Sequence, residues 1–513
     1  MPDRVLPVKG VNVGSVWRVH WVTDRQLSAD AGHPMLRGWT DLDEREEACR
    51  IDPGDPFMTD PDYRVDARLT RYFSRSSFAH LARETKRNYT TDCCLFFNFL
   101  WLRGKNWCDA EPEDLLDFED WRRWSPRNPQ RIGGAKWNRE LAAIRHLYTW
   151  AVAKRYVSAS PVIEREMMSR TGEVVRIPAA RAKDVRSSNV KWLTPRTYRL
   201  WRDVGLRGYD AYGRRDPSWR GRHDDRNAAF SDVLFSSGVR RSEGGSLLTI
   251  EVPDRTGEGR RFYAGRLGRE VTKSKRERTF YVSAEALAAV DAYCATSRRA
   301  VIRRAQAAGR YEKLAGAVVV TRGTGRSGSM LHWTDRRGRK VERALTTLTV
   351  VERASLLIEG PGGLEPLWLW LSQDGTPFWP HSWEAVYRAG SERCQRVLAG
   401  RVASPPFMTP HMARHSFALH MLVALQHVHD QRFGLTPEER RDFRLLYGDV
   451  WRMVKDLLGH RSEETTRDIY LAPVADLQVR SLLLEEPSKD TTDLLAAIAA
   501  ASHRVLDTEA VVA

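Results

Sequence analysis

The side chains best suited to chemistry in this sequence lie in one stretch, residues 409–473. In chain order they are His411, Arg414, His415, His460 and Tyr470. A guanidinium is a permanently charged planar fork that can hold phosphate through two hydrogen bonds, and an imidazole moves protons near neutral pH. A phenol can be a nucleophile, but its pKa of about 10 requires a nearby base and cations. Together these groups predict chemistry on a phosphodiester.

Two helices must position these groups. Thr409 is a suitable N-cap and Pro410 a suitable first residue, so a helix is predicted to begin there. His411 and Arg414, at spacing i and i+3, then share one helical face. Apolar residues at 3.6-residue spacing predict a second helix over residues 446–458, which Gly459 ends just before His460.

Two further segments lie upstream. A helix predicted from Arg226 leads to Gly238-Val239-Arg240-Arg241-Ser242-Glu243, and Lys273-Ser274-Lys275-Arg276-Glu277-Arg278 precedes a short apolar run. With His411-x-x-Arg414-His415, Leu458-Gly459-His460 and Tyr470, this order resembles the tyrosine recombinase (phage integrase) family. The resemblance covers roughly residues 76–480. Two departures are the glycines at 244 and 245, where leucines are usual, and the ten residues from His460 to Tyr470, where nine are usual.

The resemblance implies a role for each matched residue. Tyr470 would attack a DNA phosphodiester and form a 3′-phosphotyrosyl link, while Arg240 and Arg414 hold the nonbridging oxygens. His411 would assist deprotonation of Tyr470, and His460 would hydrogen-bond the phosphate. Lys273, on a β-hairpin, would be the general acid, with Lys275 as a possible substitute. Glu243 would support the active site.

The same resemblance implies partners. It implies double-stranded DNA attachment sites, a homotetramer on DNA, and an excisionase or DNA-bending protein as a possible accessory factor, with no cofactor. Alternatives are a type IB topoisomerase-like or telomere-resolving enzyme, and a non-catalytic DNA-binding protein that keeps the fold. A zinc site is disfavoured, because Met412 stands where a zinc protease helix would carry glutamate.

Composition agrees with a nucleic-acid partner. The 513 residues carry a net charge of +16, which favours a polyanion. Six cysteines without a C-x-x-C pair indicate reduced thiols. The sequence contains neither a signal peptide nor an apolar run of membrane-spanning length. We therefore expect a cytoplasmic protein without a membrane partner, and the resemblance implies that it is nucleoid-associated and encoded by a bacterium or phage.

The expected fold class is mainly α with a small antiparallel β-sheet. An N-terminal extension (1–75), acidic in its second half, precedes a helical, SAM-like core-binding domain (76–165). A basic linker (166–190), a catalytic domain (191–480) and a tail helix (481–513) follow. The tail could pack on its own catalytic domain or on a neighbouring protomer. Candidate DNA contacts are Lys86, Arg87, Arg139, Arg145, Arg176, Arg181 and Lys275.

Overall fold

The structure is a computed structural model, and contacts divide the chain into two compact units, 1–187 and 188–513. The residues that it describes are 16–22, 48, 54–168, 172–185, 190–255, 259–314, 316–324, 329–334, 338–431, 450–459, 491–502 and 504–508. His460 and Tyr470 lie outside these residues. The finer five-part division of the chain stays a prediction.

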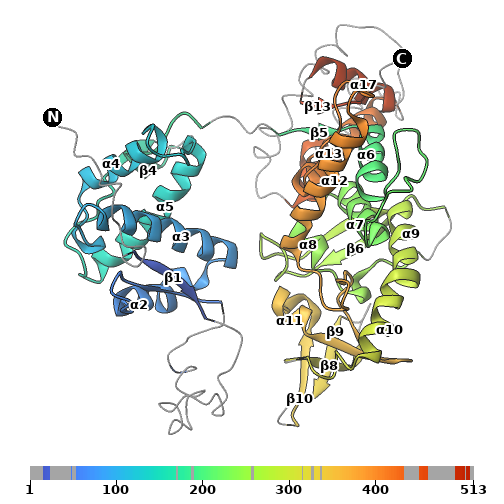
Figure 1. Cartoon of the computed structure of the whole chain (residues 1–513), viewed down its shortest axis with the longest axis horizontal. Coiled ribbons are helices and arrows are strands. Elements are labelled where there is room, and N and C mark those ends of the chain that lie inside the picture. Colours follow the sequence, from blue (N-terminus) through green and yellow to red (C-terminus); the bar gives the residue numbers. More distant parts are fainter. Residues whose placement is uncertain are drawn as a thin grey trace. The chain divides into compact units, whose positions relative to one another are not determined.

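The first unit is a helical bundle with two small antiparallel strand pairs (Figure 1). Its helices are α2 (Ala67–Arg75), η2 (Ser77–His80), α3 (Arg83–Trp101), η3 (Trp107–Asp109), α4 (Pro112–Arg123) and α5 (Gly134–Ala153). The antiparallel pairs join β1 (Arg18–Trp21) with β2 (Pro56–Thr59) and β3 (Glu164–Met168) with β4 (Val174–Pro178). The segment expected as a linker therefore begins within β3.

The core of the first unit is rich in aromatic residues. Trp107, Phe118 and Trp137 are fully buried between the helices. Trp17 and Met58 join the same core, so the described parts of the expected N-terminal extension pack with the bundle. Burial of large rings supplies most of the stabilisation in such a bundle.

The second unit contains the other helical elements that the structure describes (Figure 1). They are α6 (Pro195–Trp201), η4 (Arg202–Leu206), α7 (Asp224–Ser237), α8 (Arg241–Gly245), η5 (Thr249–Glu251), α9 (Ala284–Tyr293), η6 (Cys294–Arg298), α10 (Arg299–Ala307), η8 (Leu345–Thr347), α11 (Val350–Ala354), η9 (Pro380–Ser382), α12 (Trp383–Leu398), α13 (Pro410–Gln431), α15 (Val450–Leu458) and α17 (Thr491–Ala501). Thr194 caps α6, because its hydroxyl accepts the Thr197 amide at 3.3 Å.

Three sheets complete the second unit. β6 (Phe262–Leu267) and β7 (Arg278–Ser283) form an antiparallel pair, and β5 (Trp192–Leu193) pairs in parallel with β13 (Val505–Leu506). The largest sheet has the order β10-β9-β8-β11-β12. Its strands are β8 (Val318–Thr324), β9 (Met330–Thr334), β10 (Lys340–Ala344), β11 (Leu356–Gly360) and β12 (Gly363–Pro366). β8 and β11 run parallel, so this sheet is mixed.

The mainly α fold class with small sheets is confirmed, but the largest sheet is mixed where the sequence predicted an antiparallel one, because β8 and β11 run parallel. The apolar pattern of residues 247–252 suits a strand, but the segment forms a short 3₁₀ turn, η5, and makes one isolated bridge, Leu248 with Trp368. The tail helix α17 packs on α13 of its own chain, where Leu495 and Ile498 are buried beside Leu422. None of the helices described is both long enough and apolar enough to cross a membrane.

Candidate active site

Helix α13 presents the imidazole and guanidinium groups as predicted. It begins at Pro410, and the Thr409 hydroxyl accepts the Met412 amide at 3.2 Å. His411 reaches the surface, whereas Arg414 is only 2% exposed and His415 only 4%. The rings of His411 and His415 meet edge to face, with centroids 4.3 Å apart.

The turn from α7 to α8 brings Arg240 to the same place. α7 ends at Gly238, whose φ is +63°, and a Cβ there would lie 2.2 Å from the Phe417 ring on α13. Only glycine allows both this backbone conformation and this approach. Arg414 donates from Nη1 to the Gly238 carbonyl, which ties α13 to the turn. Arg240 follows two residues later as the N-cap of α8.

Glu243 is the carboxylate that organises these cations. It is fully buried, and its Oε1 accepts Nη1 of Arg240 at 2.9 Å while Oε2 accepts the Arg240 backbone amide at 2.8 Å. Arg278 donates to Oε2 as well. Burial alone would raise the pKa of Glu243, but the charges of Arg278, Arg240 and Arg414 outweigh it and hold that pKa below the usual range. The carboxylate is therefore ionised and keeps the Arg240 fork in one orientation.

The C-terminal end of α15 contacts two of the arginines of the site. Arg414 donates from Nη2 to the Leu458 carbonyl, and Arg278 donates to the Leu457 carbonyl at 3.0 Å. Gly459 then ends the helix with φ of +65°, as predicted. His460 is the next residue and lies outside the described part of the chain, as does Tyr470.

Lys273 lies in the loop between β6 and β7, on a hairpin as the resemblance implies, and its side chain is exposed. Its charge reaches His411. Packing around His411, followed by the charges of Arg414, Arg240 and Lys273, lowers the pKa of that imidazole. His411 is therefore neutral at pH 7 and able to accept a proton.

A cavity of about 640 Å³ adjoins these residues. Arg240, His411 and Arg414 line one part of it, and residues of α12 and the segment before α13 line the rest. Arg241 and Glu384 form an ion pair that also borders it. The guanidinium groups of Arg240 and Arg414 are the type of group that binds phosphate oxygens in pairs.

The glycines at 244 and 245 have a packing reason. A Cβ on Gly244 would lie 3.0 Å from Cδ2 of Leu234 and 3.1 Å from Cγ2 of Val239, and one on Gly245 would lie 3.2 Å from Pro380. No room remains for leucine side chains at either position. The close approach lets the Trp370 indole donate to the Gly244 carbonyl at 2.8 Å, which anchors α8 to the core.

Most candidate DNA contacts are ion-paired within their own unit. The pairs are Lys86–Asp55 at 2.8 Å, Arg139–Asp92 at 3.1 Å, Arg145–Glu164, Arg176–Glu166 at 3.4 Å and Lys275–Glu270 at 2.7 Å. Arg87 and Arg181 are exposed. Lys86 is 15% exposed and its partner 9%, so this pair contributes to the fold of the first unit.

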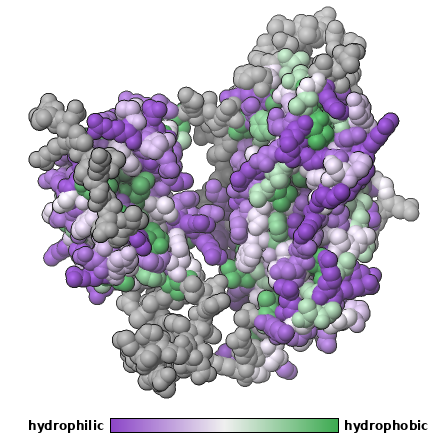
Figure 2. All heavy atoms as spheres, in the orientation of Figure 1, coloured by the Kyte–Doolittle hydropathy of each residue, from purple (hydrophilic) through white to green (hydrophobic). Residues whose placement is uncertain are grey.

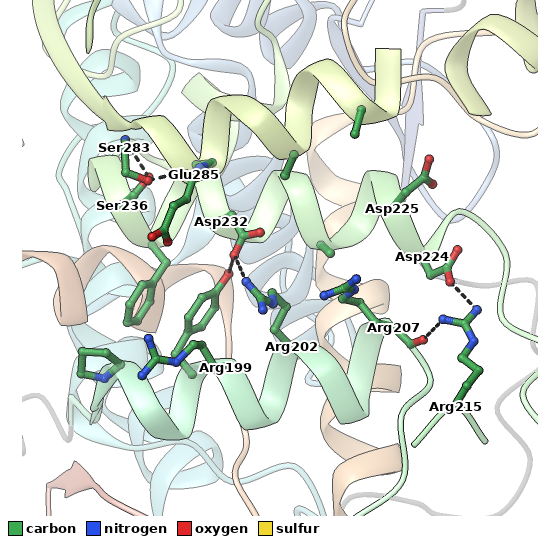
Figure 3. Close-up of a pocket in the computed structure, with 17 residues that line it drawn as sticks. Arg199, Arg202, Arg207, Arg215, Asp224, Asp225, Asp232, Ser236, Ser283 and Glu285 are labelled. Carbon is green, nitrogen blue, oxygen red and sulfur yellow. Dashed lines mark hydrogen bonds and ion pairs between the residues drawn. The ribbon is translucent and has the colours of Figure 1, made fainter. Parts of the chain in front are cut away.

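A second cavity, of about 470 Å³, lies between α6, α7 and α9 (Figure 3). Sequence reasoning gave its residues no role. In this cavity Asp232 accepts hydrogen bonds from Tyr198 at 2.6 Å and from Arg202 at 3.0 Å. These three polar side chains are therefore hydrogen-bonded to one another. The second cavity shares no lining residue with the first cavity. Within the described part of the chain, no three His, Cys, Asp or Glu side chains cluster as metal ligands would.

No protein-family model matches the sequence, and no curated protein does either. Solved structures with some likeness include the XerA recombinase, with 14% identity and a TM-score of 0.29 over 82% of this chain and 98% of that one. A lambda integrase (75–356) dimer bound to a COC′ core site has 10% identity and a TM-score of 0.39 over 79% and 94%. XerH site-specific recombinase bound to difH substrate, in its pre-cleavage complex, has 11% identity and a TM-score of 0.38 over 80% and 81%. The solved structures that this chain resembles are thus tyrosine recombinases and integrases, at low identity and low TM-score.

Proposed function

We propose that this protein is a site-specific tyrosine recombinase that cuts and rejoins DNA through a 3′-phosphotyrosyl intermediate. The observation that carries the proposal is the convergence of Arg240, Arg414 and His411, from segments far apart in the sequence, around one cavity. The buried carboxylate of Glu243 holds Arg240 in place beside that cavity. A phosphate clamp with a neutral base is the arrangement that phosphoryl transfer from DNA to a phenol requires.

The proposed reaction assigns each group one task. The phenol oxygen of Tyr470 attacks the scissile phosphorus, and His411 accepts its proton. Arg240 and Arg414 stabilise the charge that builds on the nonbridging oxygens, and His460 donates a further hydrogen bond. The bond from phosphorus to O5′ breaks as Lys273 donates a proton to that oxygen. The phosphotyrosyl link conserves the bond energy, so a 5′ hydroxyl can reverse the step.

At the level of assembly, we propose double-stranded DNA attachment sites as substrate and four protomers on two sites. Strand exchange would integrate or excise a mobile element, with an excisionase or DNA-bending protein as accessory factor. A type IB topoisomerase or telomere resolvase would use the same cleavage step but reseal the DNA without exchange between sites. A non-catalytic DNA-binding protein would keep the clamp residues and form no covalent bond.

The test is a nicked suicide duplex taken from the DNA that flanks the gene. Cleavage releases a short 5′-hydroxyl fragment that diffuses away, so the covalent protein–DNA complex accumulates on a denaturing gel. We expect this complex with the wild type and its loss in Tyr470→Phe, which retains the ring but has no nucleophilic oxygen. Tight, salt-sensitive binding without any covalent complex would favour the non-catalytic alternative. A complex that survives Tyr470→Phe would identify a different nucleophile.

A further inference from the structure

Arg278 occupies the point where three parts of the candidate active site meet. It is the first residue of β7, where it pairs with Leu267 of β6. Its side chain is 9% exposed, and the guanidinium bonds both to Oε2 of Glu243 and to the Leu457 carbonyl at 3.0 Å. One planar fork therefore connects the β6–β7 hairpin, the carboxylate behind Arg240 and the last turn of α15.

The contact with α15 is close and directional. The last carbonyls of a helix have no partner within it and attract cations. Here Arg278 holds the Leu457 carbonyl and Arg414 the Leu458 carbonyl. Gly459 passes directly over the Arg278 stem, since a Cβ at Gly459 would lie 2.8 Å from Cδ of Arg278. Arg278 and Arg414 thus fix the place where α15 ends.

The loop that leads into Arg278 is held together by its own hydrogen bonds. Thr272 is 2% exposed, and its hydroxyl donates to the Arg276 carbonyl at 2.8 Å and accepts the Arg276 amide at 3.2 Å. Lys275 donates its backbone amide to the Thr272 carbonyl at 3.2 Å. Lys273 lies inside this small closed turn. Because the turn is stiff, its anchor on β7 determines where the ammonium of Lys273 can reach.

We propose that Arg278 is a positioning residue that sets the distance between Lys273 and the phosphate held by Arg240. This inference rests on the proposed function. The guanidinium of Arg278 does not touch the substrate in this role. It locks the base of the Lys273 loop to Glu243, and Glu243 in turn orients Arg240. The step that depends on it is proton donation from Lys273 to O5′ as the bond from phosphorus to O5′ breaks.

The chemistry of the leaving group separates this role from a general effect on folding. When sulfur replaces O5′ at the scissile position, a 5′ thiolate leaves. A thiol has a pKa near 8.5, far below that of an alcohol, so its thiolate can leave without a general acid. A variant that only misplaces Lys273 therefore cleaves the sulfur substrate at the wild-type rate. A variant with a damaged phosphate clamp, nucleophile or overall fold cleaves the sulfur substrate slowly as well.

The experiment measures single-turnover cleavage rates for the full-length wild type, Arg278→Lys and Arg393→Lys. Each protein is tested on an all-oxygen suicide duplex and on the same duplex with a 5′-bridging phosphorothiolate. Lysine keeps the charge but cannot bond in two fixed directions. Arg393 is a matched control, because it is buried and bridges Asp216 at 2.6 Å and the Tyr209 carbonyl at 2.8 Å, and it does not line the cavity. General acid catalysis contributes about 10²–10⁴-fold, so we expect Arg278→Lys to lose about tenfold to a hundredfold on the oxygen substrate. On the sulfur substrate we expect it to approach the wild-type rate.

Arg393→Lys should leave the ratio of the two substrate rates unchanged, whatever it does to stability. Equal loss by Arg278→Lys on both substrates, or no loss on either, overturns the inference. If the wild type cleaves neither substrate, the proposed function itself fails and the inference fails with it. Should Arg278→Lys not fold, Thr272→Val loosens the same turn at its other end and must show the same sulfur rescue, or the inference is wrong.

Discussion

His411 lies in a strongly cationic environment, and this determines its protonation state. Packing around the ring and the charges of Arg414, Arg240, Lys273 and Arg241 all lower the pKa of His411 below its usual 6.5. The neutral ring is the form that can accept a proton from a phenol. The cations that would bind the phosphate therefore also keep the proposed base ready at neutral pH.

We predict that the cleavage rate stays level as pH falls through 6.5 and decreases only below the lowered pKa of His411. Arg241→Ala removes one of the charges that lower this pKa, so the acidic limb of the profile should move to higher pH. Single-turnover cleavage of the suicide duplex, measured from pH 5 to pH 8, tests both statements. A wild-type limb at or above pH 6.5 would show that His411 is not the group that titrates.

At the scale of elements, successive parts of α13 serve the site and the core. Its first turn presents His411 and Arg414 to the cavity, and farther along Phe417 and Leu422 pack in a separate core with Trp192 and α17. β13 extends this contact by pairing in parallel with β5. The described part of the tail thus braces, within one chain, the helix that carries the candidate base.

Ile498→Ala should lower the free energy of unfolding by about 3 kcal/mol, because Ile498 is 1% exposed and its truncation leaves a cavity. Ile358→Ala is the same truncation at a position 37% exposed on β11, and it should cost about 1 kcal/mol or less. Urea unfolding followed by tryptophan fluorescence measures both. The loss of unfolding free energy in Ile498→Ala should not depend on protein concentration. If that loss grows on dilution, the tail packs on a neighbouring protomer instead.

At the scale of the whole molecule, charge is the dominant feature. The chain carries 82 Lys and Arg against 66 Asp and Glu, and hydrophilic residues cover much of the visible face of both units (Figure 2). Many of these cations are already paired with carboxylates, however, so the count of 82 Lys and Arg overstates how many can contact phosphates. The adjacent residues Lys86 and Arg87 on α3 show the difference between a paired and an available cation. Lys86 is paired with Asp55, whereas Arg87 is exposed.

DNA affinity should fall by about three to five decades between 50 and 200 mM salt if six to ten phosphates are contacted. Arg87→Ala should weaken binding and reduce the slope of log affinity against log salt by about 0.9. Lys86→Ala should leave that slope unchanged and lower stability instead, because it leaves Asp55 without its ion-pair partner at 2.8 Å. Fluorescence anisotropy with a labelled duplex measures the slopes. Equal slopes for wild type and Arg87→Ala would show that Arg87 does not contact a DNA phosphate.

Local signals in the sequence were sufficient for several elements of the site. The Thr409 cap with Pro410, the i, i+3 spacing of His411 and Arg414, and the glycine stop at 459 are each encoded within a few residues. Short-range sterics and hydrogen bonding determine such features, so they can be read before the fold is known. The hairpin position of Lys273 was implied by the resemblance of its motif to a known family, and the structure places Lys273 between β6 and β7.

Only the tertiary structure decided which distant residues meet. Arg278 was one basic residue among several in its motif until β7 placed it between Glu243 and Leu457. Lys86 resembled its neighbour Arg87 until packing placed Asp55 beside it. The segment 247–252 has an apolar pattern suited to a strand, but it makes only one bridge and forms a 3₁₀ turn. Local sequence therefore determined which groups could perform phosphodiester chemistry, whereas long-range packing decided their neighbours, because a charge or a strand edge is satisfied only by what the fold brings to it.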